Sequence, residues 1–202
     1  MNVVFPERTA RVKFIFDSKR AMSDDAFYQF CIANPDLRME RTEQGEIVIV
    51  PPAGYESDFR NADVVAQLTN WAKRDRRGRA SGPTTVFILP NGAALSPDAA
   101  WISNGRIEKV PKAERRGFMR VSPEFVVEVM SPSDRLKDAK GKMEVWIRSG
   151  VALAWLIDAD RKTVHIYRAH GESETRSEIR KLAGEGPMSG FTLDLTEIWA
   201  GL

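Results

Sequence analysis

The sequence contains one cysteine, Cys31, and two histidines, His165 and His170. A single cysteine cannot form an internal disulfide and has no further cysteines for a thiolate zinc site, which is typical of proteins in a reducing interior. The histidines lie late in the chain near an expected hairpin, where they make a poor metal site. Long hydrophobic runs are absent as well. No segment is long enough to span a bilayer, and the N-terminal stretch MNVVFPERTARVK lacks the apolar core of a secretory signal. We therefore expect a cytoplasmic protein without a membrane partner.

The composition is that of an ordinary globular protein. Of 202 residues, 43% are hydrophobic and 29% are charged, which excludes a disordered chain. This length predicts a single domain over residues 1–202, because two full domains would each be small.

The formal net charge is only +2, but the charge is unevenly distributed. Residues 71–120 contain eleven lysines or arginines and four acids, so this block carries +7. Its two basic clusters, KRDRRGR and KVPKAERRGFMR, could form a surface that faces phosphate groups. They could equally be solvated charges at a helix end and in a loop.

Hydrophobic periodicity and turn signals predict a mixture of helices and strands. Three helices are expected, over residues 23–33 with Ser23 as N-cap, over 58–74, and over 135–148 with Ser133 or Asp134 as cap and Gly150 at its end. Strands are expected over residues 37–41, 46–50, 85–89, 98–103, 125–130, 152–157 and 163–167, with a basic loop before residue 125. This order predicts an α/β or α+β fold in which helices pack against a mixed sheet.

The stretch PEFVVEVMSPSDR contains an unexpected carboxylate. Glu128 lies within the apolar run 125–130, which looks like a central strand covered by helices on both sides. Burying an ionised carboxylate without a partner costs several kcal/mol, so Glu128 needs a cation or strong hydrogen-bond donors.

Two further carboxylates lie on other expected strands. Asp98 follows Pro97 at the start of an apolar strand, and Glu40 lies in the first hairpin. If Glu40, Asp98 and Glu128 converge, their repulsion calls for a divalent cation, and all-oxygen ligands favour Mg²⁺ or Mn²⁺ over zinc. The alternative is that each acid pairs with an arginine or is exposed at a strand end.

Several motifs in order resemble one known family. Asp98, the segment EVMSPS from Glu128, Lys142 and the segment GVALAWLID from Gly150 resemble the family described as putative restriction endonucleases, found in cyanobacteria and other bacteria. This family is a branch of the PD-(D/E)XK nuclease superfamily. ERTEQGEIVIVPP and RNADVVAQLTNW match its N-terminal half, so the resemblance spans nearly the whole chain. It implies a restriction-endonuclease-like mixed sheet with additional antiparallel hairpins.

The resemblance also implies roles for individual residues. Asp98 would be the central metal ligand, Glu128 the second acid, and Glu40 the N-terminal acid that completes the site. The usual lysine would fall at position 130, where this sequence has Met130. The matching lysine is Lys142 in the following helix, with Lys137 and Lys140 as the other candidates; without the resemblance, Lys142 would be taken as a surface lysine.

These roles imply a Mg²⁺-dependent or Mn²⁺-dependent DNA endonuclease that hydrolyses phosphodiester bonds and acts as a homodimer, because cutting both strands usually needs two active sites. Met130 keeps open an alternative, a DNA-binding or regulatory module with the nuclease fold and little or no catalysis. A third reading is an interaction protein whose acids are ion-paired.

Overall fold

The computed structural model describes residues 12–14 and 22–201. The prediction about a leader concerns the stretch MNVVFPERTARVK, most of which lies outside the described residues. The helices of the described part are α1 (Asp24–Ala33), α2 (Tyr55–Asp75), α3 (Asn104–Lys109), α4 (Leu136–Arg148) and α5 (Thr196–Ala200), with 3₁₀ turns at Glu114–Arg116, Ala169–Gly171 and Gly186–Met188.

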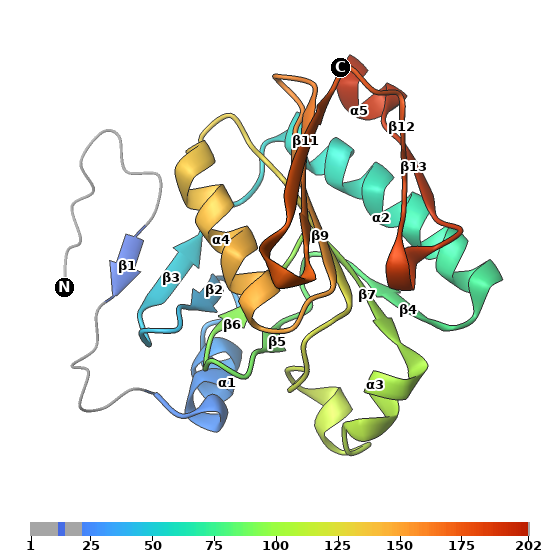
Figure 1. The fold of residues 1–202 in the computed structure, drawn as a ribbon. Coiled ribbons are helices and arrows are strands. Elements are labelled where there is room, and N and C mark those ends of the chain that lie inside the picture. The colour runs from blue at the N-terminus through green and yellow to red at the C-terminus, as the bar shows by residue number, and fades with distance from the viewer. Residues whose placement is uncertain (1–11, 15–21, 202) are drawn as a thin grey trace.

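A six-stranded sheet forms the centre of the molecule (Figure 1). In spatial order its strands are β11 (Ser173–Ser177), β10 (Thr163–Arg168), β9 (Leu153–Asp158), β8 (Phe125–Val129), β7 (Ala99–Ser103) and β4 (Gly78–Ser81). Only β8 and β9 run parallel, and the other neighbours are antiparallel. Helix α4 connects the parallel pair, because parallel neighbours need a crossover. The sheet is therefore mixed, as expected.

The two faces of this sheet are covered by different helices. Val127 and other residues of one face pack in a core cluster with α2, whereas Val126 and Met130 pack on the opposite face with Met143 and Trp146 of α4. Successive side chains of a strand point to opposite faces, so the apolar run of β8 serves both layers. This confirms the prediction that residues 125–130 form a central strand covered on both sides.

A second sheet lies beside the first. Its strands, in spatial order, are β1 (Val12–Phe14), β3 (Ile47–Val50), β2 (Arg38–Arg41), β6 (Ala94–Leu95) and β5 (Phe87–Ile88). Strands β2 and β3 form the predicted hairpin. Helix α1 packs against this sheet through the fully buried Phe27.

The C-terminal part covers helix α2. Strands β12 (Lys181–Ala183) and β13 (Thr192–Asp194) form a hairpin. Together with α5 they supply Leu182, Leu193 and Ile198 to the cluster that contains Leu68 of α2. Figure 1 shows this hairpin and α5 on the side of the sheet where α2 lies, away from α4.

The predicted α/β (α+β) class is confirmed, since helices flank a mixed sheet and antiparallel hairpins are added to it. Several element boundaries differ from the predictions. Helix α2 begins at Tyr55, one turn before the expected start, and α3 forms inside the expected basic loop with the Ser103 hydroxyl as its cap. The strand predicted over residues 85–89 shortens to Phe87–Ile88, because the amide of Leu89 already bonds across a tight turn to the carbonyl of Ala93.

The cap of helix α4 also differs from the prediction. Its N-cap residue is Arg135, without a side-chain hydrogen bond to the helix, rather than Ser133 or Asp134. The carboxylate of Asp134 is instead bonded by the backbone amide and hydroxyl of Ser131, which closes the turn before the helix. Gly150, expected at the end of this helix, has the positive φ of 94° that such a position favours.

Candidate functional site

Lys142 of helix α4 lies between two glutamates from different sheets. Its Nζ atom is 2.9 Å from Oε1 of Glu40 on β2 and 2.9 Å from Oε1 of Glu128 on β8, and it donates to the carbonyl oxygen of Ser96 at 3.1 Å. Burial alone would lower the pKa of Lys142, but the two carboxylates outweigh burial and raise it. Lys142 is therefore an ammonium ion at neutral pH.

Glu128 is the buried carboxylate that the sequence singled out. Its side chain is 13% exposed, and Oε1 also accepts a hydrogen bond from the indole Nε1 of Trp146 at 2.9 Å. Burial raises the pKa of Glu128 to about 7; Lys142 opposes this rise, whereas Asp98 and Glu40 add to it. Within the described residues, Oε2 accepts no hydrogen bond and so remains available to a ligand.

Asp98 immediately precedes β7 and stands across from Glu128. Ala99 pairs with Val127 in the antiparallel ladder. Asp98, one residue before Ala99, therefore faces Glu128, one residue after Val127. The Oδ2 atom of Asp98 accepts the backbone N–H of Val129 at 2.8 Å, and Oδ1 accepts from Nδ2 of Asn61 on α2 at 3.2 Å. Burial raises the pKa of Asp98, although the Val129 amide and Lys142 act in the opposite direction.

Glu40 completes the cluster from β2. Its Oε1 accepts from the backbone amide of Ser96 at 3.0 Å and from Lys142, so one oxygen fixes the carboxylate against the segment before β7. Neither Glu40 nor Glu128 is ion-paired with an arginine in the described part of the chain. The acids predicted from the sequence therefore lie around one lysine.

The arrangement differs in one respect from a ready-made metal site. Among residues 12–14 and 22–201, no group of three or more histidine, cysteine, aspartate or glutamate side chains is placed so that it could hold one ion. The ammonium group of Lys142 supplies positive charge to Glu40 and Glu128 instead. Metal ligation by Glu40, Asp98 and Glu128 therefore stays a prediction.

Two cavities open beside the cluster, and Glu40 lines both. One of about 220 Å³ is lined by Arg38, Glu40 and Ser96, and one of about 360 Å³ by Glu40, Lys137 and Lys142. The guanidinium group of Arg38 donates to the carbonyl oxygen of Pro83 at 2.9 Å and acts electrostatically on Asp98. Cationic side chains thus stand at both openings next to the acids.

Only one of the lysines considered from the sequence contacts the acids. Lys137 is exposed at the rim of the larger cavity. The pKa of His165 is lowered mainly by burial and also by the charge of Lys140, so Lys140 lies near that histidine. Met130, at the position where the superfamily carries its lysine, is buried in the core beneath α4.

The basic cluster KRDRRGR lies away from the acids. Gly78 pairs with Ser103, so the cluster KRDRRGR reaches the end of the sheet opposite Asp98 and Glu128. Several arginines of the block 71–120 already have partners within the protein: Arg77 binds Asp75, and Arg106 binds Glu124 and the carbonyl oxygen of Ser122. The interpretation of the two basic clusters as a surface that faces phosphate groups stays a prediction.

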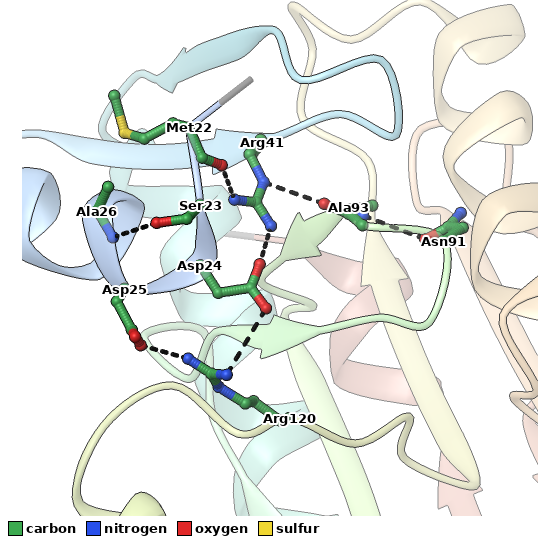
Figure 2. Close-up of polar contacts among 10 residues, drawn as sticks. Met22, Ser23, Asp24, Asp25, Ala26, Arg41, Asn91, Ala93 and Arg120 are labelled. Carbon is green, nitrogen blue, oxygen red and sulfur yellow. Dashed lines mark hydrogen bonds and ion pairs between the residues drawn. The ribbon is translucent and has the colours of Figure 1, made fainter. Parts of the chain in front are cut away.

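A buried arginine anchors the strand that carries Glu40. Figure 2 shows Arg41 at the centre of a polar cluster with the start of α1. Its guanidinium group donates to the carbonyl oxygen of Met22 at 2.7 Å, to Oδ1 of Asp24 at 2.5 Å and to the carbonyl oxygen of Gly92 at 3.0 Å. Arg120 pairs with Asp24 and Asp25 from the neighbouring loop. Only 4% of the Arg41 side chain is exposed, so its guanidinium group is held inside the protein by these partners.

Sequence reasoning missed three side chains of the site. Trp146 follows Lys142 by one helical turn and therefore lies on the same side of α4, but the sequence identified no partner for its indole. Asn61 and Arg38 reach the acids from α2 and β2, and no local signal marks either residue.

Comparisons with known proteins identify a family and a solved structure with a similar fold. The sequence model of the Uma2 family, described as "Putative restriction endonuclease", matches residues 24–196. A solved structure of a putative nuclease belonging to DUF820 from Anabaena variabilis has a TM-score of 0.68 and 22% identity, and the alignment covers 80% of this chain and 89% of that one. At this identity the likeness concerns the fold alone. No curated protein matches the chain. None of the helices in the described part of the chain has the length and apolar character needed to cross a bilayer.

Proposed function

The chain belongs to the Uma2 family of putative restriction endonucleases, and from this premise we propose that it is a Mg²⁺-dependent or Mn²⁺-dependent DNA endonuclease. The observation that carries the proposal is the position of the Lys142 ammonium group between the buried carboxylates of Glu40 and Glu128, with Asp98 across from Glu128. Nucleases that use one or two metal ions need carboxylates that hold the metal next to the scissile phosphate.

The donor set fits a hard divalent ion. Asp98 and Glu128 offer carboxylate oxygens only, and Mg²⁺ and Mn²⁺ prefer oxygen ligands. We propose that these two residues hold the ion and that Glu40 primarily holds Lys142. When bound, the ion would polarise a phosphate oxygen and lower the pKa of a water molecule.

Lys142 acts through its charge in this proposal. Because its pKa is raised, it keeps its proton at neutral pH and can donate to a phosphate oxygen or orient a water molecule. The protonated group stabilises negative charge that develops on the phosphate and cannot itself accept a proton from water. Lys142 is therefore proposed as an electrostatic and orienting residue rather than a general base.

DNA is proposed to approach over the two cavities beside the acids. Arg38 stands at one cavity and Lys137 at the other, so both can contact phosphates on either side of the scissile bond. A two-fold homodimer would bring two such sites to the two strands of a duplex. A cytoplasmic location, where DNA is accessible in bacteria, stays part of the proposal.

A second candidate function is a DNA-binding module without useful catalysis. Met130 favours it, because the position that usually carries the lysine belongs to the core. It predicts salt-sensitive DNA binding without cleavage in either Mg²⁺ or Mn²⁺.

Plasmid nicking tests the choice between these candidates. We expect cleavage by the unaltered protein in Mg²⁺ or Mn²⁺, no cleavage in EDTA, and losses of about 100-fold or more in Asp98→Asn, Glu128→Gln and Lys142→Met. Lys140→Met, on the same helix, is the matched control and should keep activity. Equal cleavage by all variants would reject the assigned roles, and binding without cleavage in any divalent metal would favour the second candidate.

A further inference from the structure

The side-chain amide of Asn61 on helix α2 has a hydrogen-bond partner at its nitrogen but none at its oxygen. Its Nδ2 donates to Oδ1 of Asp98 at 3.2 Å, whereas its Oδ1 is buried and accepts no hydrogen bond in the structure. A buried acceptor without a donor costs about 1–3 kcal/mol. Such a group at a functional site requires an explanation.

The side-chain amide of Gln67, on the same helix, has hydrogen-bond partners at both its nitrogen and its oxygen. Gln67 donates from Nε2 to Asp63 and to the carbonyl oxygen of Asp194, and its Oε1 accepts the backbone amide of Asp194 at 2.8 Å. Both ends of Gln67 therefore have partners, and its role is to attach α2 to the strand β13. The unpaired oxygen of Asn61 is thus not a general property of amides on this helix.

The chemistry of the unpaired atom is that of a ligand for a hard cation. Rotation about the Cβ–Cγ bond exchanges the two ends of the amide and would bring Oδ1 next to Oδ1 of Asp98. Two oxygen atoms can face each other in this way only with a cation or a proton between them. An amide oxygen is also a normal ligand of divalent ions that prefer oxygen.

An amide ligand would resolve the shortage of acids in the described residues. No three histidine, cysteine, aspartate or glutamate side chains are placed there to hold one ion, and Lys142 binds one oxygen of Glu40 and one oxygen of Glu128. A site built on Asp98 can be extended from α2 without disturbing that lysine.

We propose that Asn61 is a metal-binding residue whose side-chain amide turns to present Oδ1 to the divalent cation held by Asp98. This inference rests on the proposed function, since it assigns a further ligand to the same site. In the absence of the cation, the amide donates to Asp98 and keeps that carboxylate in place.

Calorimetric titration with Mn²⁺ tests the proposal, with the hyperfine signal of bound Mn²⁺ in electron paramagnetic resonance as a second readout. We expect Asn61→Ala to weaken Mn²⁺ binding about 10-fold or more, and Asn61→Asp, which keeps an oxygen ligand at this position, to bind at least as tightly as the unaltered protein. Gln67→Ala, which removes the other amide of α2, should leave Mn²⁺ affinity unchanged.

A purely structural role predicts a different pattern. If Asn61 only donated a hydrogen bond to Asp98, Asn61→Ala would keep both proposed acidic ligands, Asp98 and Glu128, and would bind Mn²⁺ with the affinity of the unaltered protein. That result would overturn the inference and leave the proposed function intact. An unaltered protein that binds no Mn²⁺ would overturn both.

Discussion

At the scale of single residues, the raised pKa of Glu128 contributes to the pH dependence of the stability of the metal-free protein. The pKa of Glu128 is raised from 4.5 to about 7, chiefly by burial. The folded protein therefore keeps this proton over a pH range in which the unfolded chain has lost it, so the free energy of unfolding falls as pH rises from about 4.5 to 7. Below this range both states are protonated and the full stability is present.

Glu128→Gln should remove this pH dependence, because the amide does not titrate. We expect the unaltered protein in EDTA to lose about 2–3 kcal/mol between pH 5 and pH 8 from this group, and the variant to lose correspondingly less. Urea unfolding at the two pH values measures the difference. Glu144→Gln, which changes an exposed residue of helix α4, is the control and should behave like the unaltered protein. The same pH dependence in Glu128→Gln would contradict the account.

The indole of Trp146 stabilises the ionised form of Glu128. Trp146→Phe removes the N–H donor but keeps an aromatic ring in the core, so the pKa of Glu128 should rise by about one further unit. The measurement is the pH midpoint of the stability change in EDTA. Trp101→Phe removes an indole whose Nε1 has no hydrogen-bond partner, so its midpoint should not move. Equal midpoints in the two variants would show that the Trp146 donor does not act on Glu128.

The candidate site could be predicted from the sequence only in part. Glu128 stands out because its neighbours are apolar, and the motifs around Asp98 and Lys142 come in a recognisable order. Asn61 was not predictable, since its contact with Asp98 joins residues 37 positions apart and depends on how α2 packs against the sheet. Long-range contacts of this kind leave no periodicity in the chain.

At the scale of elements, helix α1 is attached to the second sheet through Arg41 (Figure 2). Arg41→Met would leave the Met22 and Gly92 carbonyls and Asp24 without their donor, so we expect a loss of about 2–4 kcal/mol of unfolding free energy. Urea unfolding measures it. Arg120→Met, which removes an arginine whose side chain is 41% exposed, should cost about 1 kcal/mol or less. A cost for Arg41→Met no larger than for Arg120→Met would show that the cluster is not an anchor.

Element types were easier to predict than element ends. Ser23 caps α1 as expected by accepting from the amide of Ala26, and β8 at Phe125–Val129 lies within its predicted range. Short strands such as β6 and the helix α3 were missed, because their formation depends on neighbouring strands and on a cap within a charged segment. Local propensity alone does not contain that information.

At the scale of the whole molecule, the two ends of the central sheet should differ in their contribution to DNA binding. Arg38→Ala and Lys137→Ala, near the acids, should each weaken binding and reduce the salt slope by about 1. Arg74→Ala, an exposed arginine near the opposite end, should change neither. Fluorescence anisotropy in Ca²⁺ at several salt concentrations measures both quantities. The reverse pattern would place DNA on the basic block instead.

The single domain predicted for residues 1–202 stays a prediction. One domain should unfold in a single cooperative transition, with the same midpoint for tryptophan fluorescence and for far-ultraviolet circular dichroism. Two separate midpoints would contradict it.

The central claim is that Asp98 and Glu128 together hold a divalent cation beside Lys142. A crystal of the protein soaked in Mn²⁺ and measured at the manganese absorption edge tests this claim most directly. The account predicts an anomalous peak within ligand distance of both carboxylates, at about 2.0–2.4 Å from their oxygens, with the Lys142 ammonium group nearby. The absence of a peak at these residues, or a peak elsewhere only, would contradict it.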